Sequence, residues 1–152
     1  MIEIERMNLL HLIEEVRNMH IIPANKATDE MLEEFFNRNE NLDKNSLVEK
    51  GFVVEIGSKI EGCFILDEMD EKDAYWLKQL YITRTEANKL PVLLESILTI
   101  AKSMDAKSVY VHSHQPVVDI LLEALQFHPQ TDAGFVDKYP LKKGSWWTYN
   151  VS

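Results

Sequence analysis

The residues best suited to chemistry gather in one turn, TRTEANKLP at positions 83–91, which joins an alternating apolar segment to an amphipathic one. The turn carries two basic side chains, Arg84 and Lys89, with a hydroxyl on Thr85 and an amide on Asn88. Where a strand runs into a helix, the first N–H groups of the helix point toward a bound anion. The turn is therefore a candidate phosphate-binding site, with the basic residues as charge partners.

The same turn has features that oppose a close approach by phosphate. It contains no glycine, the residue that best lets a backbone lie against a ligand. Glu86 adds a negative charge, and Pro91 removes one N–H group from the expected start of the helix. The sequence thus leaves a second interpretation open, in which Arg84 and Lys89 are ordinary solvated surface charges.

Groups suited to proton transfer or metal binding are scattered. His112 and His114 lie two apart in an expected strand, so both point to one face, and a histidine there is a candidate base. A third metal ligand is not evident, because Cys63, His20 and His128 are far apart in the sequence. We expect no metal site, and we expect Cys63 to be a small core residue.

The elements that position these groups follow from hydrophobic periodicity and turn residues. The expected strands cover residues 2–6, 52–56, 60–66, 74–82, 108–114 and 146–151, with one further strand open in the tail. The expected helices cover residues 9–19, 29–41, 91–104 and 116–127. Thr28 is the expected N-cap of the second helix, and Gly57-Ser58 is a two-residue hairpin turn. Trp146 and Trp147 face opposite ways, one into the core and the other toward a pocket or interface.

This order predicts an α/β (α+β) fold with a mixed, mostly antiparallel central sheet and helices on both faces. The β–helix–β passage over residues 74–113 implies one parallel pair of strands with a right-handed crossover. The length of 152 residues fits a single domain, residues 1–152.

Composition limits the classes of molecule that the protein is expected to bind and the compartment in which it is expected to work. The net charge of −9, from 16 basic and 25 acidic residues, repels nucleic acid and attracts a cationic small molecule or basic peptide. One cysteine excludes an internal disulfide, which fits a reducing cytoplasm. Acidic residues interrupt the apolar runs of the N-terminus, and no apolar stretch is long enough to span a bilayer. We expect a cytoplasmic protein that does not bind membranes.

The order and lengths of these elements resemble the GNAT-type N-acetyltransferase superfamily over nearly the whole chain. Residues 76–82 are similar to the acetyl-CoA-binding strand of that family, and residues 91–104 to the long helix after its phosphate-binding turn. Residues 109–114 resemble the strand that splays away from the cofactor strand, and residues 116–127 resemble the following helix. The run LLEALQF at 121–127 is similar to the family run lYekLGF.

The resemblance implies acetyl-CoA as co-substrate and a small-molecule or peptide amine as acceptor. It implies a cofactor site formed by Leu80, Tyr81, Ile82, Arg84, Thr85, Asn88, Lys89 and Leu90. The chain departs from the family at the glycine-rich turn and at the tyrosine that protonates the leaving thiolate, where Leu122 stands.

No catalytic residue is selected by the sequence. The candidates for acid or base are Tyr110, His114 and Glu55, with Glu61, Tyr139 and Tyr149 as further ones. Two functions follow: an acetyl-CoA-dependent N-acetyltransferase, or a protein of the same fold that binds acyl-CoA, another ligand or a partner without turnover. Association into a homodimer is left open.

Overall fold

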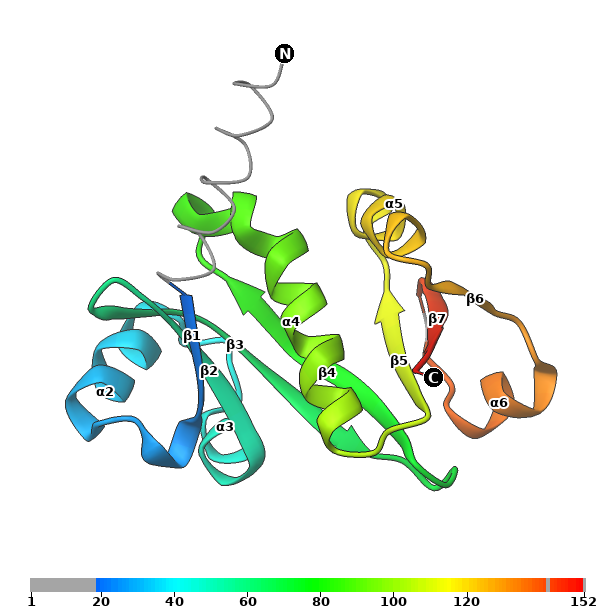
Figure 1. The fold of residues 1–152 in the computed structure, drawn as a ribbon, viewed down its shortest axis with the longest axis horizontal. Helices are drawn as coiled ribbons and strands as arrows, with labels where there is room; N and C mark the ends of the chain where they lie inside the picture. The colour runs from blue at the N-terminus through cyan, green and yellow to red at the C-terminus, as the bar shows by residue number, and fades with distance from the viewer. Residues whose placement is uncertain (1–18, 142, 152) are drawn as a thin grey trace, which may run out of the picture. The chain divides into compact units, whose positions relative to one another are not determined.

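The computed structural model describes residues 19–141 and 143–151. Its strands form a seven-stranded sheet in the order β1-β2-β3-β4-β5-β7-β6 (Figure 1). The pairs β1–β2, β2–β3, β5–β7 and β6–β7 are antiparallel, whereas β4 and β5 are parallel. The expected mixed, mostly antiparallel sheet with one parallel pair is therefore confirmed.

The elements follow the chain in alternating groups. The strands are β1 Met19–Pro23, β2 Gly51–Ile56, β3 Lys59–Glu68, β4 Ala74–Ile82, β5 Ser108–Ser113, β6 His128–Gln130 and β7 Ser145–Asn150. The α-helices are α2 Asp29–Arg38, α3 Lys44–Lys50, α4 Leu90–Ser103, α5 Pro116–Ala124 and α6 Ala133–Lys138, and the 3₁₀ segments are η1 Ala24–Lys26 and η2 Arg84–Lys89. Within the described residues, no helix is long and apolar enough to cross a membrane.

The chain divides into two compact units. The first takes in the chain up to Ile65 together with Gln79–Val92, and the second takes in Leu66–Lys78 together with Leu93–Ser152. Strands β3 and β4 and helix α4 each contribute residues to both units.

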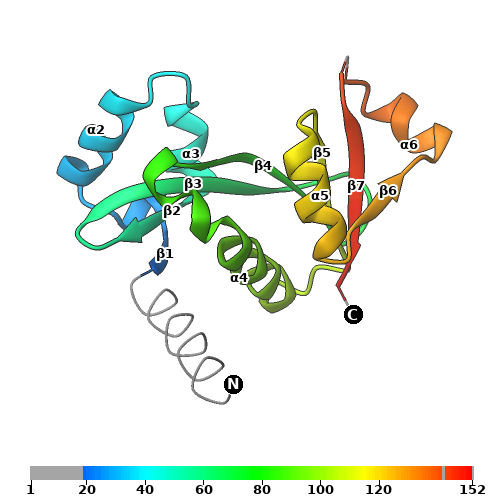
Figure 2. The same cartoon turned by 90° about the horizontal axis from the view of Figure 1, so that it is seen from above.

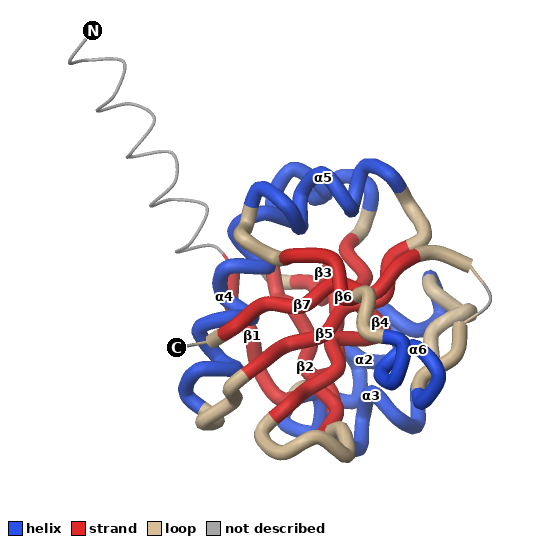
Figure 3. Tube along the Cα trace, turned by 90° about the vertical axis from the view of Figure 1, so that its right-hand side faces the viewer, coloured by secondary structure: helices blue, strands red, loops and turns tan. Residues whose placement is uncertain are grey.

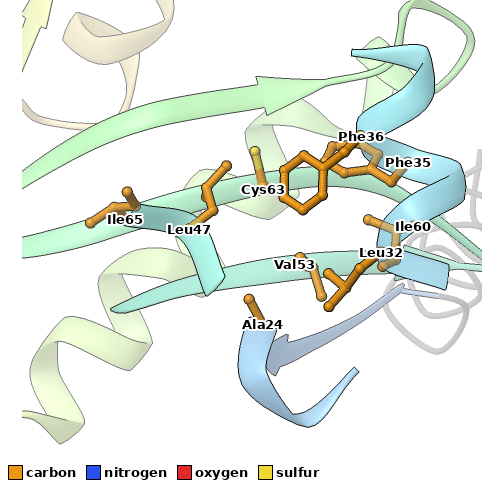
Figure 4. Packing of buried hydrophobic residues seen from close by; sticks show 9 residues of the cluster. All are labelled: Ala24, Leu32, Phe35, Phe36, Leu47, Val53, Ile60, Cys63 and Ile65. Atoms are coloured by element: carbon orange, nitrogen blue, oxygen red, sulfur yellow. The ribbon is translucent and has the colours of Figure 1, made fainter. Parts of the chain in front are cut away.

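The core of the first unit lies between its helices and one face of β2 and β3. Helix α2 begins after Thr28, whose hydroxyl accepts the N–H of Met31 at 3.2 Å, so the expected N-cap is confirmed. The buried residues of this cluster are Ala24, Leu32, Phe35, Phe36, Leu47, Val53, Ile60, Cys63 and Ile65 (Figure 4). Their removal from water is the main term that stabilises this unit.

The second unit has helices on both faces of its strands. Helix α5 lies on one face, where Trp147 Nε1 donates a hydrogen bond to Asp119 Oδ1 at 3.1 Å. Helix α6 lies on the other, where Phe135 packs edge-on against Trp146, with ring centroids 5.2 Å apart. Figure 2 shows α5 and α6 on opposite sides of β7, and Figure 3 shows the same arrangement from the side. Trp146 and Trp147 thus face opposite ways, and both are buried.

Three sequence predictions need correction. Residues 19–23 form strand β1 where the first helix was expected to end, because this segment pairs with β2 from Met19↔Ile56 onward. The rest of that helix and the strand at 2–6 lie outside the described residues. Helices α3 and α6 stand where loops were expected, each begun by an aspartate N-cap, Asp43 and Asp132.

Candidate functional site

The C-terminal half of β4 contains an irregularity at Gln79, whose φ is 55°. A non-glycine residue in this left-handed region within a strand marks a bulge. Neighbouring residues hold it: the Cys63 thiol donates to the Gln79 carbonyl at 3.4 Å, and the Asp43 N–H donates to the Gln79 side-chain oxygen at 3.4 Å. The regular extended backbone of β4 is therefore interrupted at Gln79.

After the bulge, alternate residues of β4 face β3. The Thr83 N–H donates to the Glu61 carbonyl at 2.8 Å. The Tyr81 carbonyl lies against Gly62 so closely that a Cβ on Gly62 would come within 2.7 Å of it. Successive residues of a strand address opposite neighbours, so Leu80 and Ile82 point their N–H groups to the other edge.

That other edge is not covered by the parallel ladder. The pairing of β4 with β5 runs from Ala74↔Ser108 to Leu77↔Val111, whereas β4 continues to Ile82. The ladder thus stops before Leu80 and Ile82. Two backbone donors on one strand edge are an arrangement that can polarise a carbonyl group.

The turn is helical from its second residue. Segment η2 begins at Arg84, with Thr83 in the N-cap position, and continues into α4. The first N–H groups of this helical run are those of Arg84 and Thr85. Pro91 therefore lies inside this helical run, although the sequence predicted that the helix begins at Pro91. The Leu90 N–H, which the sequence offered to the cofactor, donates to the Ala87 carbonyl.

The two basic residues of the turn differ in how freely they can bind an anion. Arg84, Thr85 and Asn88 are exposed. Lys89 instead forms an ion pair with Glu86, and the two side chains are 17% and 23% exposed. Among the described residues, Arg84 has no ion-pair partner, so it is the free cation of the turn.

Glu61 is a buried carboxylate next to the turn. Val54 pairs with Gly62 and Glu55 pairs with Ile60, which leaves Glu61 as the extra residue of a β-bulge. Its side chain accepts a hydrogen bond from Thr83 Oγ1 at 2.6 Å and lies 3.6 Å from Arg38 Nη2. A carboxylate that is already hydrogen-bonded and faces a guanidinium is a poor candidate for a general base. Glu55 lies half-buried on β2.

The candidate acids of the second unit have their own partners. Tyr110 stacks on Phe135, with ring centroids 4.6 Å apart. The Tyr139 hydroxyl donates to Glu71 at 2.7 Å, and burial together with this carboxylate raises the pKa of Tyr139. Tyr149 packs against Phe127 and lines a pocket of about 360 Å³ between α4, the end of α5 and β7.

The histidines differ in exposure. His114 is exposed, just beyond the end of β5. His112 is half-buried, with its ring 5.3 Å from that of Trp146, and burial lowers the pKa of His112. The described residues include no group of three histidine, cysteine, aspartate or glutamate side chains that could hold a metal ion. Leu122, at the position of the family's tyrosine, is fully buried.

The structure brings together, within the first unit, the edge of β4, the turn and the Glu61–Thr83 contact. Tyr110, His114, Tyr139 and Tyr149 belong to the second unit. No role was predicted from the sequence for Arg38, or for Thr83 beyond its place in the turn. Glu61 is an acidic residue inside the apolar run KIEGCFIL, and this position was the one sequence signal that its carboxylate is buried.

Comparison with known proteins rests on structure, since no family model and no curated protein matches the sequence. An acetyltransferase of the GNAT family from Staphylococcus aureus Mu50 superposes with a TM-score of 0.66 at 16% identity, over 88% of this chain and 99% of that one. The chain has the GNAT fold. The fold class expected from the resemblance is thereby confirmed.

Two further structures with the GNAT fold contain the cofactor. The Campylobacter jejuni N-acetyltransferase PseH in complex with acetyl coenzyme A has a TM-score of 0.67 at 12% identity, over 88% of this chain and 99% of that one. A Bacillus subtilis acetyltransferase in complex with CoA has a TM-score of 0.63 at 11% identity, over 89% of this chain and 99% of that one. The TM-scores establish a shared fold, and at identities this low they establish no more.

Proposed function

We propose that the chain is an acetyl-CoA-dependent N-acetyltransferase that transfers an acetyl group to a primary amine. The observation that carries the proposal is the open edge of β4, where the N–H groups of Leu80 and Ile82 lie directly before a helical turn. Donors to a carbonyl and donors to a phosphate thus follow one another on a single segment, as an acyl-CoA requires. The GNAT fold supports the same assignment by analogy.

In the proposed reaction the neutral amine of the acceptor attacks the thioester carbonyl carbon. The Leu80 and Ile82 N–H groups stabilise the negative charge that develops on the carbonyl oxygen. The carbon–sulfur bond then breaks, the thiolate of CoA leaves, and the nitrogen releases a proton. A thiol with a pKa near ~8.5 leaves without a dedicated acid, so water can protonate it.

The proposed cofactor residues have distinct roles. Arg84 supplies the free cation for the pyrophosphate, and the N–H groups of Arg84 and Thr85 supply backbone donors. Thr85 and Asn88 offer exposed polar side chains beside them. The net charge of −9 favours a cationic acceptor, either a small amine or a basic peptide.

A second candidate function is binding of acyl-CoA without turnover. It is favoured by one specific observation: Leu122 occupies the position of the family's proton donor and is fully buried. The Lys89 charge is compensated by Glu86, which weakens the attraction for phosphate and so counts against both candidates.

Calorimetric titration with acetyl-CoA tests the binding step common to both candidates, and thiol detection of released CoA with a panel of amines tests turnover. We expect binding, and we expect a rate that rises with pH as the acceptor amine becomes neutral. Binding without CoA release from any amine between pH 6 and 10 would favour the second candidate. Absence of binding at millimolar acetyl-CoA would exclude both.

A further inference from the structure

We propose that Glu61 and Thr83 act as a positioning pair that fixes the start of the turn and keeps its first N–H groups open to the pyrophosphate of a CoA ester. This inference rests on the proposed function. Neither residue contacts the reacting atoms, and both act through the backbone of Arg84 and Thr85.

The first line of evidence is a double connection between β3 and the turn. The Thr83 N–H donates to the Glu61 carbonyl at 2.8 Å, and the Thr83 hydroxyl donates to the Glu61 carboxylate at 2.6 Å. Both side chains are buried, with residue exposures of 8% for Glu61 and 7% for Thr83. Thr83 is the residue immediately before η2, so this connection sets where the helical run begins.

The second line is that the Thr83 hydroxyl does not do what a threonine at this position ordinarily does. Threonine is a favoured N-cap because its side-chain oxygen accepts an N–H group from the first turn of the helix. Thr28 and Asp43 cap α2 and α3 in this way, whereas Thr83 makes no side-chain cap. The carboxylate of Glu61 holds the hydroxyl instead, so the hydroxyl does not accept the Thr85 N–H or the Glu86 N–H, the two groups within reach of an N-cap side chain. The Glu86 N–H donates to the Thr83 carbonyl at 3.0 Å, and the Thr85 N–H is left without a side-chain acceptor from the N-cap.

The third line is the cost of the arrangement. A carboxylate out of water is unfavourable unless it is paired and hydrogen-bonded. Here the partial compensation comes from the Thr83 hydroxyl and from Arg38, which also donates to the Ile60 carbonyl at 3.0 Å. The β-bulge at Glu61 gives the carboxylate this direction, and bulges are frequent beside functional sites, where they re-aim a side chain.

Thr83→Val is the test, because valine has nearly the shape of threonine without the hydroxyl. Thr148→Val is the matched control: Thr148 is also 7% exposed, but its hydroxyl has no hydrogen-bond partner among the described residues and it lies in the second unit. Thr83→Ser restores the hydroxyl. The measurements are the dissociation constant for CoA by calorimetry, and amide hydrogen exchange over residues 84–90, both well below the unfolding temperature.

We expect Thr83→Val to weaken CoA binding by about tenfold, the effect of a lost hydrogen bond to a charged group. We also expect it to speed amide exchange at Glu86, whose N–H donates to the Thr83 carbonyl. Thr83→Ser and Thr148→Val should both retain wild-type affinity and wild-type exchange in the turn. A purely structural role would lower the unfolding temperature of Thr83→Val and leave both measurements unchanged, which would overturn the proposal. Equal loss of affinity in Thr148→Val would also overturn it.

Failure of this inference is distinguishable from failure of the proposed function. If wild type binds no CoA, the proposed function fails, and the claim that the pair keeps the turn open to CoA fails with it. If wild type binds CoA and Thr83→Val binds it equally well, the proposed function stands and the positioning pair is rejected. Should Thr83→Val not fold, Glu61→Gln gives a second test, because the amide keeps an acceptor for the hydroxyl and removes the charge. It should retain the exchange protection of the Glu86 N–H, and faster exchange there would count against hydroxyl anchoring.

Discussion

Lys89 and Glu86 form an ion pair inside the turn, three residues apart along one helical segment. Both side chains are largely buried, at 17% and 23% exposure, so the pair is shielded from solvent more than an ordinary surface pair. Because Glu86 pairs with Lys89, the acidic residue of the turn does not cancel the charge of Arg84. Glu86 neutralises Lys89, and Arg84 remains as the charge available to an anion.

Glu86→Gln should strengthen CoA binding by about two- to fivefold, equivalent to roughly 0.5–1 kcal/mol, because it frees Lys89. Lys89→Ala should weaken binding less than Arg84→Ala, for which we expect a loss of ~1–3 kcal/mol. Calorimetry at low salt measures all three, with Glu95→Gln on the exposed face of α4 as the control. An equal loss in Lys89→Ala and Arg84→Ala would show that the ion pair opens on binding.

His112 should make the second unit less stable in acid. Burial is the main cause of its lowered pKa and the neighbouring His114 adds to it, while the Lys143 backbone and Asp119 act in the opposite direction. The unfolded chain therefore binds more protons than the folded chain as pH falls through ~6.5, and stability decreases with it. Unfolding temperatures at pH 7 and pH 5 should differ less for His112→Asn than for wild type. An identical pH dependence in the variant would contradict this.

Gln126→Gly should stabilise the protein. Gln126 has a φ of 75° just beyond the end of α5, a left-handed conformation that glycine adopts without a steric penalty. We expect a gain of about 0.5–1 kcal/mol in the free energy of unfolding, measured by urea denaturation. Glu123→Gly, inside the same helix, should instead cost about 1 kcal/mol. Loss of stability in Gln126→Gly would mean that its side chain makes contacts worth more than the strain.

Leu122→Tyr should destabilise the protein and should not raise turnover. The family's tyrosine at this position suggests the opposite, but Leu122 is fully buried, and its carbonyl accepts the Phe127 N–H at 2.9 Å. A larger ring with a hydroxyl overpacks this site at a cost of ~1–3 kcal/mol. Chemical denaturation and CoA release measure the two effects, with Leu122→Met as the volume-conserving control. Higher turnover in the tyrosine variant would show that the hydroxyl reaches the thiolate.

Periodicity alone located the elements with strong apolar patterns. The hairpin at Gly57-Ser58, strand β4 and helix α4 each bury several residues at regular spacing, and each was expected near its actual bounds. Helices α3 and α6 escaped because each buries a single residue, Leu47 or Phe135, which leaves no period to detect. Strand β1 escaped because its conformation depends on pairing with β2.

The candidate site was predicted only in part. The turn and its basic residues are contiguous in sequence, so their types and spacing were visible. The Glu61–Thr83 contact spans 22 positions and depends on a bulge that breaks the alternation of β3. The Lys89–Glu86 pair depends on η2 being helical, which the turn residues did not indicate. The bulge arises from pairing between strands, and the ion pair arises from local helical geometry, so neither follows from the apolar pattern of the sequence.

The lone thiol of the chain has a practical consequence. Cys63 is fully buried, and burial raises the pKa of its thiol to about 12, so the native protein should be inert to maleimides at neutral pH. A maleimide can then react only with molecules in which β3 has opened. The rate of labelling therefore measures how often the first unit opens. A cysteine introduced at exposed Asn88 would, by the same reasoning, accept a fluorophore selectively and report ligand arrival at the turn.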